Sequence, residues 1–307
     1  NIFFSLQTGS GREGLNFESI KGIEFSFPSL PEQTKIASFL TVVDEKIQAL
    51  KKKHSLLEQY KKGVMQGLFC QNQNFEDLQM NRIEDDNNPE ILKSSKSRFR
   101  QLRFKDENGK DFPEWGVKKL GEVGETYGGL SGKSKENFGI GKLYIQYKQI
   151  FDDSKIDITR FELVDIRENE NQNKVQFGDV FFTVSSETPN EIGMSSVLLD
   201  IVEELYLNSF CFGFRANSLE ELNPFFSRYL FRSESFREEI IKLAQGSTRY
   251  NMSKLQLLKI EIKLPCLDEQ TLIANFLSAL DEKINQTQMQ IQKTEVWKKG
   301  LLQKMFV

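Results

Sequence analysis

Two stretches of the chain, IEFSFPSLPEQT at residues 23–34 and IEIKLPCLDEQT at residues 260–271, are identical at seven of twelve positions. The offset of 237 residues between them is kept well beyond these stretches. DEKI at 44–47 corresponds to DEKI at 281–284, and KKG at 61–63 corresponds to KKG at 298–300. From Gly9 to Phe69, about 24 of 61 positions match their counterparts without a gap. Two merely similar amphipathic helices would not share the loop that precedes them, so the chain contains an internal duplication.

Each copy predicts a short strand followed by a long helix. Pro28 and Pro265 end the strand, because proline cannot donate to a sheet ladder. The Glu-Gln pair that follows in each copy suits the positive end of a helix. Positions that are mostly apolar then recur at alternating spacings of four and three residues. They are Ile36, Leu40, Val43, Ile47, Leu50, His54, Leu57, Lys61, Val64 and Leu68 in the first copy, and Ile273, Leu277, Leu280, Ile284, Thr287, Ile291, Thr294, Lys298, Leu301 and Met305 in the second.

This heptad spacing predicts a coiled coil rather than a helix lying on a globular core. About 37 residues at 1.5 Å per residue give a helix of roughly 55 Å. Because both helices belong to one chain, we expect them to pair with each other in antiparallel orientation. The turn around Ile36, Leu40 and Val43 would then face the end at Leu301 and Met305.

The residues between the repeats predict a linker and a mixed domain. Residues 71–97 are polar, with QNQN at 71–74 and EDDNNP at 84–89, which is typical of a partly disordered linker. From Asp111 onward, short apolar runs alternate with Gly and Asn. We expect strands at 143–150, 175–184, 195–199 and 211–215, and helices at 224–231 and 235–243. The predicted fold class is therefore α+β: one α+β domain plus two long helices packed as an antiparallel coiled coil.

The composition excludes several classes of protein. Forty-one Lys and Arg against 44 Asp and Glu give a net charge of −3, so any nucleic-acid surface must be local. No apolar run reaches the ~18 residues that a membrane span needs. Three widely spaced cysteines fit reduced thiols of the cytoplasm. With His54 as the only histidine, there is no His-based zinc pair, and a Ser-His-Asp triad would have to use His54.

Three motifs resemble catalytic sites but are incomplete. GGLSGKS at 128–134 resembles a phosphate-binding loop, yet Tyr127 occupies the position of its first glycine. NPFF at 223–226 lacks the second proline of an amino-methyltransferase motif, and Pro224 suits a helix start. EIK at 261–263 resembles a nuclease motif, but the first copy has Ser26 in place of the lysine. We therefore expect neither an autonomous methyltransferase nor a nuclease, and no catalytic, cofactor-binding or metal-binding residues.

Three polar loops of the middle domain are candidates for binding DNA. Lysines neutralise phosphates, while hydroxyls, amides and Arg can contact base edges. The candidate residues are Lys133, Lys135, Tyr144, Tyr147 and Lys148 in the first loop region, Ser185, Ser186, Thr188 and Asn190 in the second, and Thr248, Arg249 and Asn251 in the third. Each loop also fits an ordinary solvated loop. Residues 111–255 hold 17 basic and 23 acidic residues, so DNA binding requires segregated charge or a basic partner.

The repeats and the domain between them resemble type I restriction-modification specificity subunits. The resemblance rests on LPEQTKIASFL at 30–40, DEKI at 44–47 and KKGVMQ at 61–66, and on the second copy ending KKGLLQKMF at 298–306. FPEW at 112–115 and KKLGEV at 118–123 fit the start of a target-recognition domain. GDV at 178–180 and GSTR at 246–249 fit its later landmarks.

The resemblance implies a domain order and a function. We expect the tail of a first target-recognition domain at 1–22, with most of that domain lacking, and a first conserved region at 23–70. A linker at 71–110, a target-recognition domain at 111–255 and a second conserved region at 256–307 would follow. Such a subunit reads one half of a bipartite site in double-stranded DNA. Modification subunits with S-adenosylmethionine dock on its helices, and restriction subunits use ATP and Mg. The alternative is a coiled-coil scaffold without DNA readout.

Overall fold

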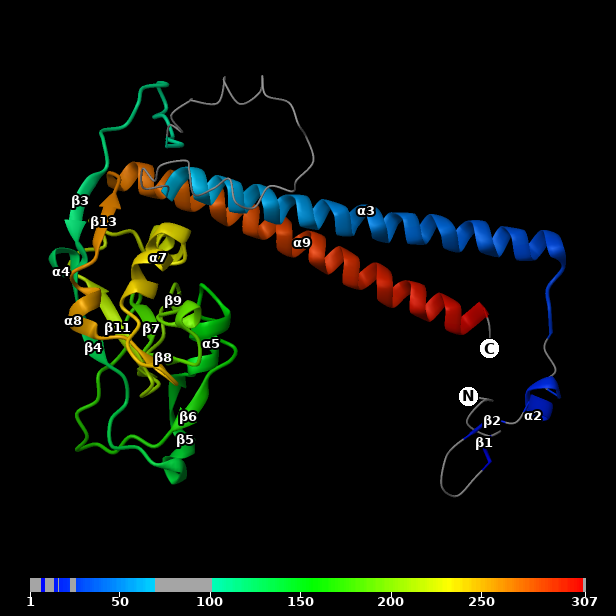
Figure 1. The fold of residues 1–307 in the computed structure, drawn as a ribbon, viewed down its shortest axis with the longest axis horizontal. Helices are drawn as coiled ribbons and strands as arrows, with labels where there is room; N and C mark the ends of the chain where they lie inside the picture. Colours follow the sequence, from blue (N-terminus) through cyan, green and yellow to red (C-terminus); the bar gives the residue numbers. More distant parts are fainter. Residues whose placement is uncertain (1–6, 9–13, 16, 23–25, 70–100, 306–307) are drawn as a thin grey trace. The chain divides into compact units, whose positions relative to one another are not determined.

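The computed structural model describes residues 7–8, 14–15, 17–22, 26–69 and 101–305 (Figure 1). The chain forms two compact units, residues 1–54 with 287–307, and residues 55–286. Two long helices, α3 (Leu30–Phe69) and α9 (Leu267–Met305), each contribute to both units. The expected fold class, an α+β domain with two long helices, is confirmed.

The predicted helical seam is confirmed. Every seam position from Ile36 to Leu68 and from Ile273 to Met305 is buried or half-buried. Phe39, Val42 and Leu56 lie off the seam and are exposed. Burial of one helix face at heptad spacing supplies the apolar contact that holds such helices together.

In the first unit, the two helices run antiparallel. Lys51 Nζ lies 2.7 Å from Glu295 Oε1, and Lys298 pairs with Asp44, so residue numbers rise along one helix as they fall along the other. The rings of Phe39 and Trp297 meet edge to face at 6.0 Å. This unit also contains β1 (Gln7–Thr8), β2 (Gly14–Leu15) and α2 (Phe17–Lys21).

In the second unit, Lys61 pairs with Asp281. This ion pair is the counterpart of the Asp44–Lys298 pair in the duplication. In both pairs the Asp belongs to a DEKI motif and the Lys to a KKG motif, and the two motifs come from different copies. Asp281 has further partners, since it accepts a hydrogen bond from the Tyr229 hydroxyl at 2.8 Å and lies 3.2 Å from Arg228 Nη2. Asp281 therefore binds the helix α9 both to α3 and to the domain.

Both copies fold their helix start in the same way. Gln33 Nε2 donates to the carbonyl of Pro28 at 2.8 Å, and Gln270 Nε2 donates to the carbonyl of Pro265 at 3.0 Å. The predicted strand before Pro265 is confirmed as β13 (Glu261–Leu264). Its counterpart before Pro28 lies partly outside the described residues.

The domain of the second unit is built from short strands and helices. Its strands are β3 (Gly116–Lys119), β4 (Gly124–Gly128), β5 (Phe138–Ile145), β6 (Glu162–Val164), β7 (Val180–Thr183), β8 (Ser185–Ser186), β9 (Ser195–Val197), β10 (Leu205–Leu207), β11 (Cys211–Ala216), β12 (Tyr250–Asn251) and β13. Its shorter helices are α4 (Leu120–Val123), α5 (Tyr147–Asp152), α6 (Pro224–Leu230), α7 (Glu234–Lys242) and α8 (Lys254–Leu257), with 3-10 turns η3 (Lys135–Asn137) and η4 (Pro189–Glu191).

The strands pair into small sheets rather than one large one. The main sheet is antiparallel in the order β4-β11-β7-β9, and a second has the order β10-β5-β6, with β10 parallel to β5. Two-stranded ladders join β13 to β3 and β12 to β8. The β13–β3 ladder connects the start of the second repeat to the domain (Figure 1).

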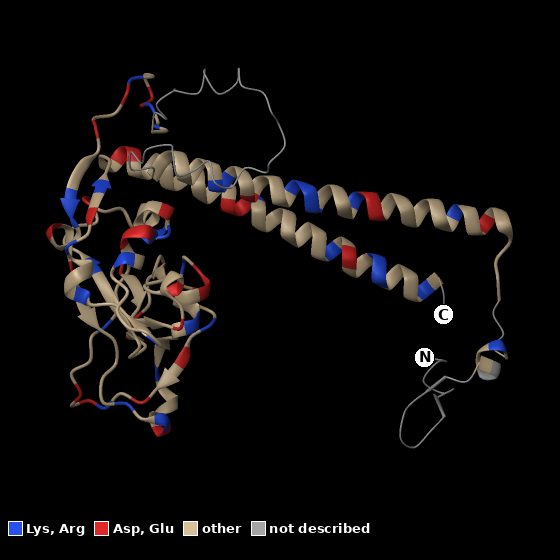
Figure 2. Cartoon of the chain, viewed as in Figure 1, with Lys and Arg blue, Asp and Glu red and all other residues tan. Residues whose placement is uncertain are grey.

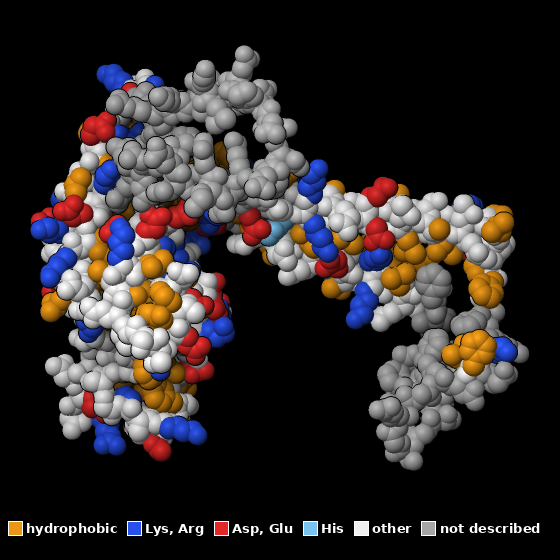
Figure 3. Space-filling view, in the orientation of Figure 1, with side chains coloured by type: hydrophobic (Ala, Val, Ile, Leu, Met, Phe, Trp, Pro, Cys, Tyr) orange, Lys and Arg blue, Asp and Glu red, His pale blue; other side chains and the backbone are white. Residues whose placement is uncertain are grey.

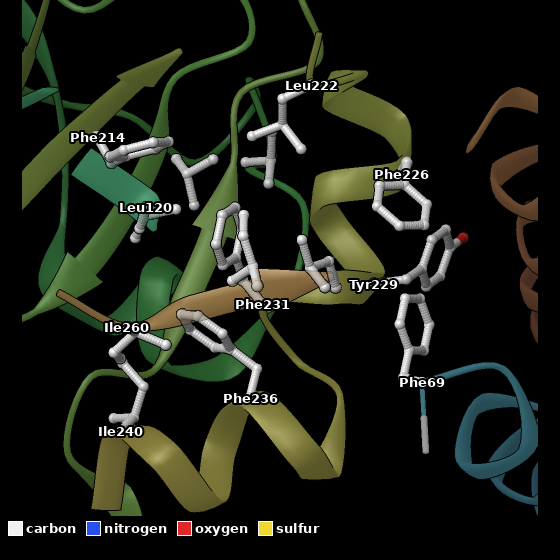
Figure 4. Packing of buried hydrophobic residues seen from close by; sticks show 14 of the residues in the cluster. Phe69, Leu120, Phe214, Leu222, Phe226, Tyr229, Phe231, Phe236, Ile240 and Ile260 are labelled. Atoms are coloured by element: carbon white, nitrogen blue, oxygen red, sulfur yellow. The ribbon is translucent and has the colours of Figure 1, made fainter. Parts of the chain in front are cut away.

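Aromatic side chains fill the core between the main sheet and the helices. Figure 4 shows Phe214 of β11, Phe231 after α6 and Phe236 of α7 packed together. Phe69, near the end of α3, lies against Phe226 with ring centroids 5.6 Å apart. The contact between Phe69 and Phe226 therefore places the end of α3 in the same core as the domain. Burial of each such ring stabilises the fold by roughly 1.5–3 kcal/mol.

Two of the predicted strands were wrong in part. The run 143–150 is strand only to Ile145, because α5 begins at Tyr147 and buries Ile150 against the second sheet. The run 175–184 is strand only from Val180. Before it, Gly178 has φ +88°, and Asp179 accepts the amide of Gln176 at 2.8 Å, which forms a turn. The predicted strands at 195–199 and 211–215 and both predicted helices are confirmed within one or two residues.

The segment before the domain is held against the second repeat. Residues 71–100 of the linker predicted at 71–110 lie outside the described part of the chain. Arg103 places Nε and Nη2 at 2.8 and 2.9 Å from the Glu269 carboxylate, and Trp115 Nε1 donates to the same group at 3.1 Å. Glu269 is fully buried, so these donors offset the cost of burying its charge.

The ion pairs related by the duplication predict unequal effects on stability. Asp281 is only 15% exposed and has three partners, whereas Asp44 is 53% exposed and pairs with Lys298. We expect Asp281→Asn to lower the free energy of unfolding by about 1.5–3 kcal/mol. Asp44→Asn, the matched control, should cost less than about 1 kcal/mol. Equilibrium urea unfolding measures both, and equal losses would contradict the prediction.

Candidate nucleic-acid interface

Backbone hydrogen bonds join four segments that are remote in sequence. The amide of Val184 donates to the carbonyl of Phe210 at 3.0 Å, and the amide of Met252 donates to the carbonyl of Val184 at 2.9 Å. The amide of Asn208 donates to the carbonyl of Ile145 at 3.1 Å. We call the four segments, residues 145–148, 183–186, 208–211 and 245–252, the loop cluster. It lies where β5, β7 and β10 end and β11 begins.

Tyr147 connects two of these segments through its side chain. Its hydroxyl donates to the carbonyl of Ser185 at 2.8 Å, and its ring stacks on Phe151 at 6.2 Å. Burial raises the pKa of Tyr147, and the nearby Arg249 guanidinium partly offsets that rise. The phenol therefore remains a neutral donor at pH 7.

The two predicted polar loops after β7 and α7 pair with each other. In the β8–β12 ladder, Ser186 faces Tyr250 and Ser185 faces Asn251. Both serines are buried, whereas Asn251 is exposed. The two loops therefore lie side by side in a single ladder, and contact of their residues with DNA stays a prediction.

A tight turn presents Thr248 and Arg249 to solvent. Gln245 and Asn251 exchange two backbone hydrogen bonds of 3.0 and 2.8 Å that close the turn. Gly246 has φ +130°, and a Cβ atom there would lie 2.2 Å from the carbonyl oxygen of Arg249. Only glycine fits this close approach. The fixed backbone leaves the two exposed side chains free to contact a ligand.

Thr188 and Asn190 follow the loop cluster directly in the chain. The Ser186 hydroxyl donates to the carbonyl of Thr188 at 2.5 Å, and the Thr188 hydroxyl donates to Glu191 at 2.9 Å. The exposed Asn190 accepts a hydrogen bond from Arg237 through its carbonyl at 3.0 Å, which leaves its amide side chain available.

The remaining candidates have other surroundings. Lys133 is 3% exposed and pairs with Glu170, so its charge is already compensated. Tyr144 donates to Glu162 at 2.8 Å, and burial raises its pKa to about 12. Lys135 is exposed in η3. Of these three, only Lys135 is available to a phosphate without breaking an existing contact, and contact of any candidate with DNA stays a prediction.

Charges of both signs are distributed over the domain. Figure 2 shows Lys and Arg positions interspersed with Asp and Glu positions along the backbone of the domain, and Figure 3 shows their side chains intermixed on the face in view. Lys148 is exposed and lies 2.9 Å from Asp152 one helical turn away, a surface pair that a phosphate can displace at little cost. This pattern favours local phosphate contacts over a broad basic surface.

Sequence reasoning missed the turn at 208–211. Asn208 Oδ1 accepts the amide of Phe210 at 2.9 Å, and the ring of Phe210 is 59% exposed. Phe212 and Phe214, which follow it at alternate positions, are fully buried. The run of phenylalanines gave no indication that the first one faces solvent, although the Asn-Ser pair before it is typical of a turn.

The described residues contain neither a candidate membrane-spanning helix nor a candidate metal site. None of the described helices is long and apolar enough to cross a membrane. Within the same ranges, no group of three or more His, Cys, Asp or Glu side chains could hold a metal ion.

The chain belongs to a family defined by the type I restriction modification DNA specificity domain, whose model matches residues 1–59 and 113–295. Among curated proteins it is similar to the type I restriction enzyme MjaVIII specificity subunit of Methanocaldococcus jannaschii, with 26% identity over 98% of this chain. The chain spans 65% of the length of that relative.

Two solved structures share the fold. The HsdS subunit from Thermoanaerobacter tengcongensis aligns with 99% of this chain and 67% of its own, with a TM-score of 0.55 and 16% identity. A structure described as showing complex assembly and conformational transition of the type I R-M system aligns with 91% of this chain and 60% of its own, with a TM-score of 0.50 and 18% identity.

The turn at Gly246 generates a prediction about the stability of the loop cluster. Gly246→Ala forces a Cβ atom into the Arg249 backbone and should lower the free energy of unfolding by about 1–3 kcal/mol. Gly132→Ala is the matched control, because Gly132 also has positive φ but no described atom lies within 4 Å of the place its methyl group would take. It should cost about 1 kcal/mol or less. Thermal and urea unfolding measure both, and a larger loss at Gly132 would refute the steric argument.

Proposed function

We propose that this chain is a sequence-specific DNA-recognition subunit of a type I restriction-modification complex. In this proposal the domain around the loop cluster reads one half of a bipartite site. The observation that carries it is the convergence of Tyr147, Ser185, Ser186, Thr248, Arg249 and Asn251 on one cluster. Membership of the DNA specificity family supports the same conclusion.

The side chains of the loop cluster suit the major groove. An Arg such as Arg249 can donate two hydrogen bonds to guanine, and an Asn such as Asn251 can bind adenine in the same bidentate way. Both are exposed next to the backbone-held turn. Lys148 and Lys135 are exposed cations that can neutralise phosphates and so position the domain.

The helix pair is the proposed docking site for modification subunits. Its seam is buried within each unit, while Phe39 and Trp297 keep about half of their surface exposed. Exposed aromatic side chains are frequent energetic centres of protein interfaces. Restriction subunits would join the assembly through these partners.

In this proposal the chain carries no catalytic group of its own. S-adenosylmethionine, ATP and Mg would be bound by the partner subunits, and the complex would act on double-stranded DNA in the cytoplasm. The acidic balance of the domain is then compatible with DNA binding, because the partners supply part of the positive surface.

The decisive experiment reconstitutes the chain with its modification subunits and maps the adenines or cytosines that become methylated in cells carrying the complex. A bipartite consensus would support the proposal and would give the half-site for binding assays. Reconstituted complexes that bind all duplexes equally would instead favour the coiled-coil scaffold, whose helices join proteins without DNA readout.

Substitutions in the loop cluster should separate base readout from phosphate contact. Arg249→Ala should cost ~1–3 kcal/mol on the cognate half-site and relax specificity at one position. Lys148→Ala should weaken binding to cognate and scrambled duplexes alike and reduce the salt slope by about one. Fluorescence anisotropy titrations at several salt concentrations measure both effects. Equal losses on all sequences for both variants would leave no residue that reads bases.

The purified chain by itself should show neither methylation nor cleavage of DNA. The lysine of the phosphate-binding-loop resemblance at 128–134 is Lys133, and its side chain pairs with Glu170. Transfer of a labelled methyl group from S-adenosylmethionine and nicking of plasmid DNA are the two assays. Turnover by the chain alone, absent from a mock preparation, would contradict the proposal.

A further inference from the structure

Phe210 is an exposed aromatic ring inside an otherwise polar site. It lies in the loop cluster, where its carbonyl accepts the amide of Val184, the residue before Ser185 and Ser186. Its ring is 59% exposed, while Phe181, Phe182 and Phe212 of the adjoining strands are fully buried. The neighbouring aromatic rings are therefore packed in the core of the sheet, whereas the ring of Phe210 faces solvent.

The backbone around Phe210 is fixed from several sides. Its amide is bound by the Asn208 side chain at 2.9 Å, and the amide of Cys211 donates to the carbonyl of Asn208 at 3.1 Å. The Asn208 backbone is in turn bound to Ile145 at the end of β5. A ring held on such a turn loses little conformational entropy on contact with a ligand.

We propose that Phe210 is a specificity-determining residue that contacts the 5-methyl group of a thymine in the recognised half-site. This inference rests on the proposed function. Apolar contact with that methyl group distinguishes thymine from the other three bases in the major groove. The polar groups of the loop cluster supply hydrogen bonds to base edges, and Phe210 supplies the apolar element that they lack.

The surroundings favour a methyl contact over insertion of the ring between base pairs. Apolar wedges act mainly from the minor groove, where they kink the duplex. Arg249 and Asn251 are exposed on the segment whose Met252 amide donates to Val184, the residue that donates to the carbonyl of Phe210. Their side chains offer donors and acceptors that match the edges of the major groove. Insertion remains an outcome that the experiment below would reveal.

The test removes one methyl group from the DNA and one ring from the protein. The full chain is reconstituted with its modification subunits, and duplexes carry the half-site found by methylation mapping. Each thymine on either strand is replaced singly by deoxyuridine. One replacement should weaken binding by about 3- to 10-fold, in line with one buried methyl group. Phe210→Ala should weaken binding to the thymine duplex at least as much and should not respond to that replacement.

The controls separate this contact from other effects. Ile201→Ala removes an 88% exposed apolar side chain outside the loop cluster and should leave every affinity unchanged. Unfolding curves confirm that both variants fold. Any of four results would overturn the inference. Phe210→Ala could bind as tightly as the unmodified chain, or its loss of affinity could add fully to that of deoxyuridine at every thymine. Phe210→Ala could also lose affinity equally for scrambled duplexes, or the half-site could contain no thymine. If the unmodified complex does not discriminate cognate from scrambled duplexes, the proposed function itself fails, which is a different result.

Discussion

The carboxylate of Asp281 holds together three elements of the second unit. It pairs with Lys61 of α3, accepts the hydroxyl of Tyr229 from α6 and lies beside Arg228. Because the carboxylate is mostly buried, these partners must all be present for its charge to be tolerated. The heptad seam brings the helices together by apolar contact. Asp281 adds the directional contacts that connect α9 to the domain core around Phe226 and Phe231.

The duplicated sequence has the same local structure in two different environments. Gln33 and Gln270 make equivalent hydrogen bonds to the prolines five residues before them. Gln33 is exposed, while Gln270 is buried and also donates to the carbonyl of Glu221 at 2.9 Å. Local sequence therefore determines how the helix begins, and the tertiary surroundings determine whether that beginning is covered.

Features with a short period in the sequence could be predicted, and features that depend on distant partners could not. The heptads of α3 and α9 and the helix start at Pro224 follow from spacing and backbone chemistry. The helix α5 was missed because the stretch 143–150, LYIQYKQI, mixes apolar and polar residues in a way that fits a strand or a helix. The hydrogen bonds of Gln149 to the backbones of Arg160 and Asp157 form only in the fold. The sequence does not indicate that Lys133 pairs with Glu170. It also does not indicate that the side chain of Phe210 is exposed.

The loop cluster is assembled mostly through main-chain groups. The bonds among Val184, Phe210 and Met252, and those closing the turn after Gln245, use amides and carbonyls that every residue except proline possesses. Side chains at 248, 249 and 251 contribute little to this frame. Their identities can therefore change while the frame persists. Under the proposed function, a descendant of this chain acquires a new DNA target by point substitution at these positions, and Gly246 is the residue that has to stay.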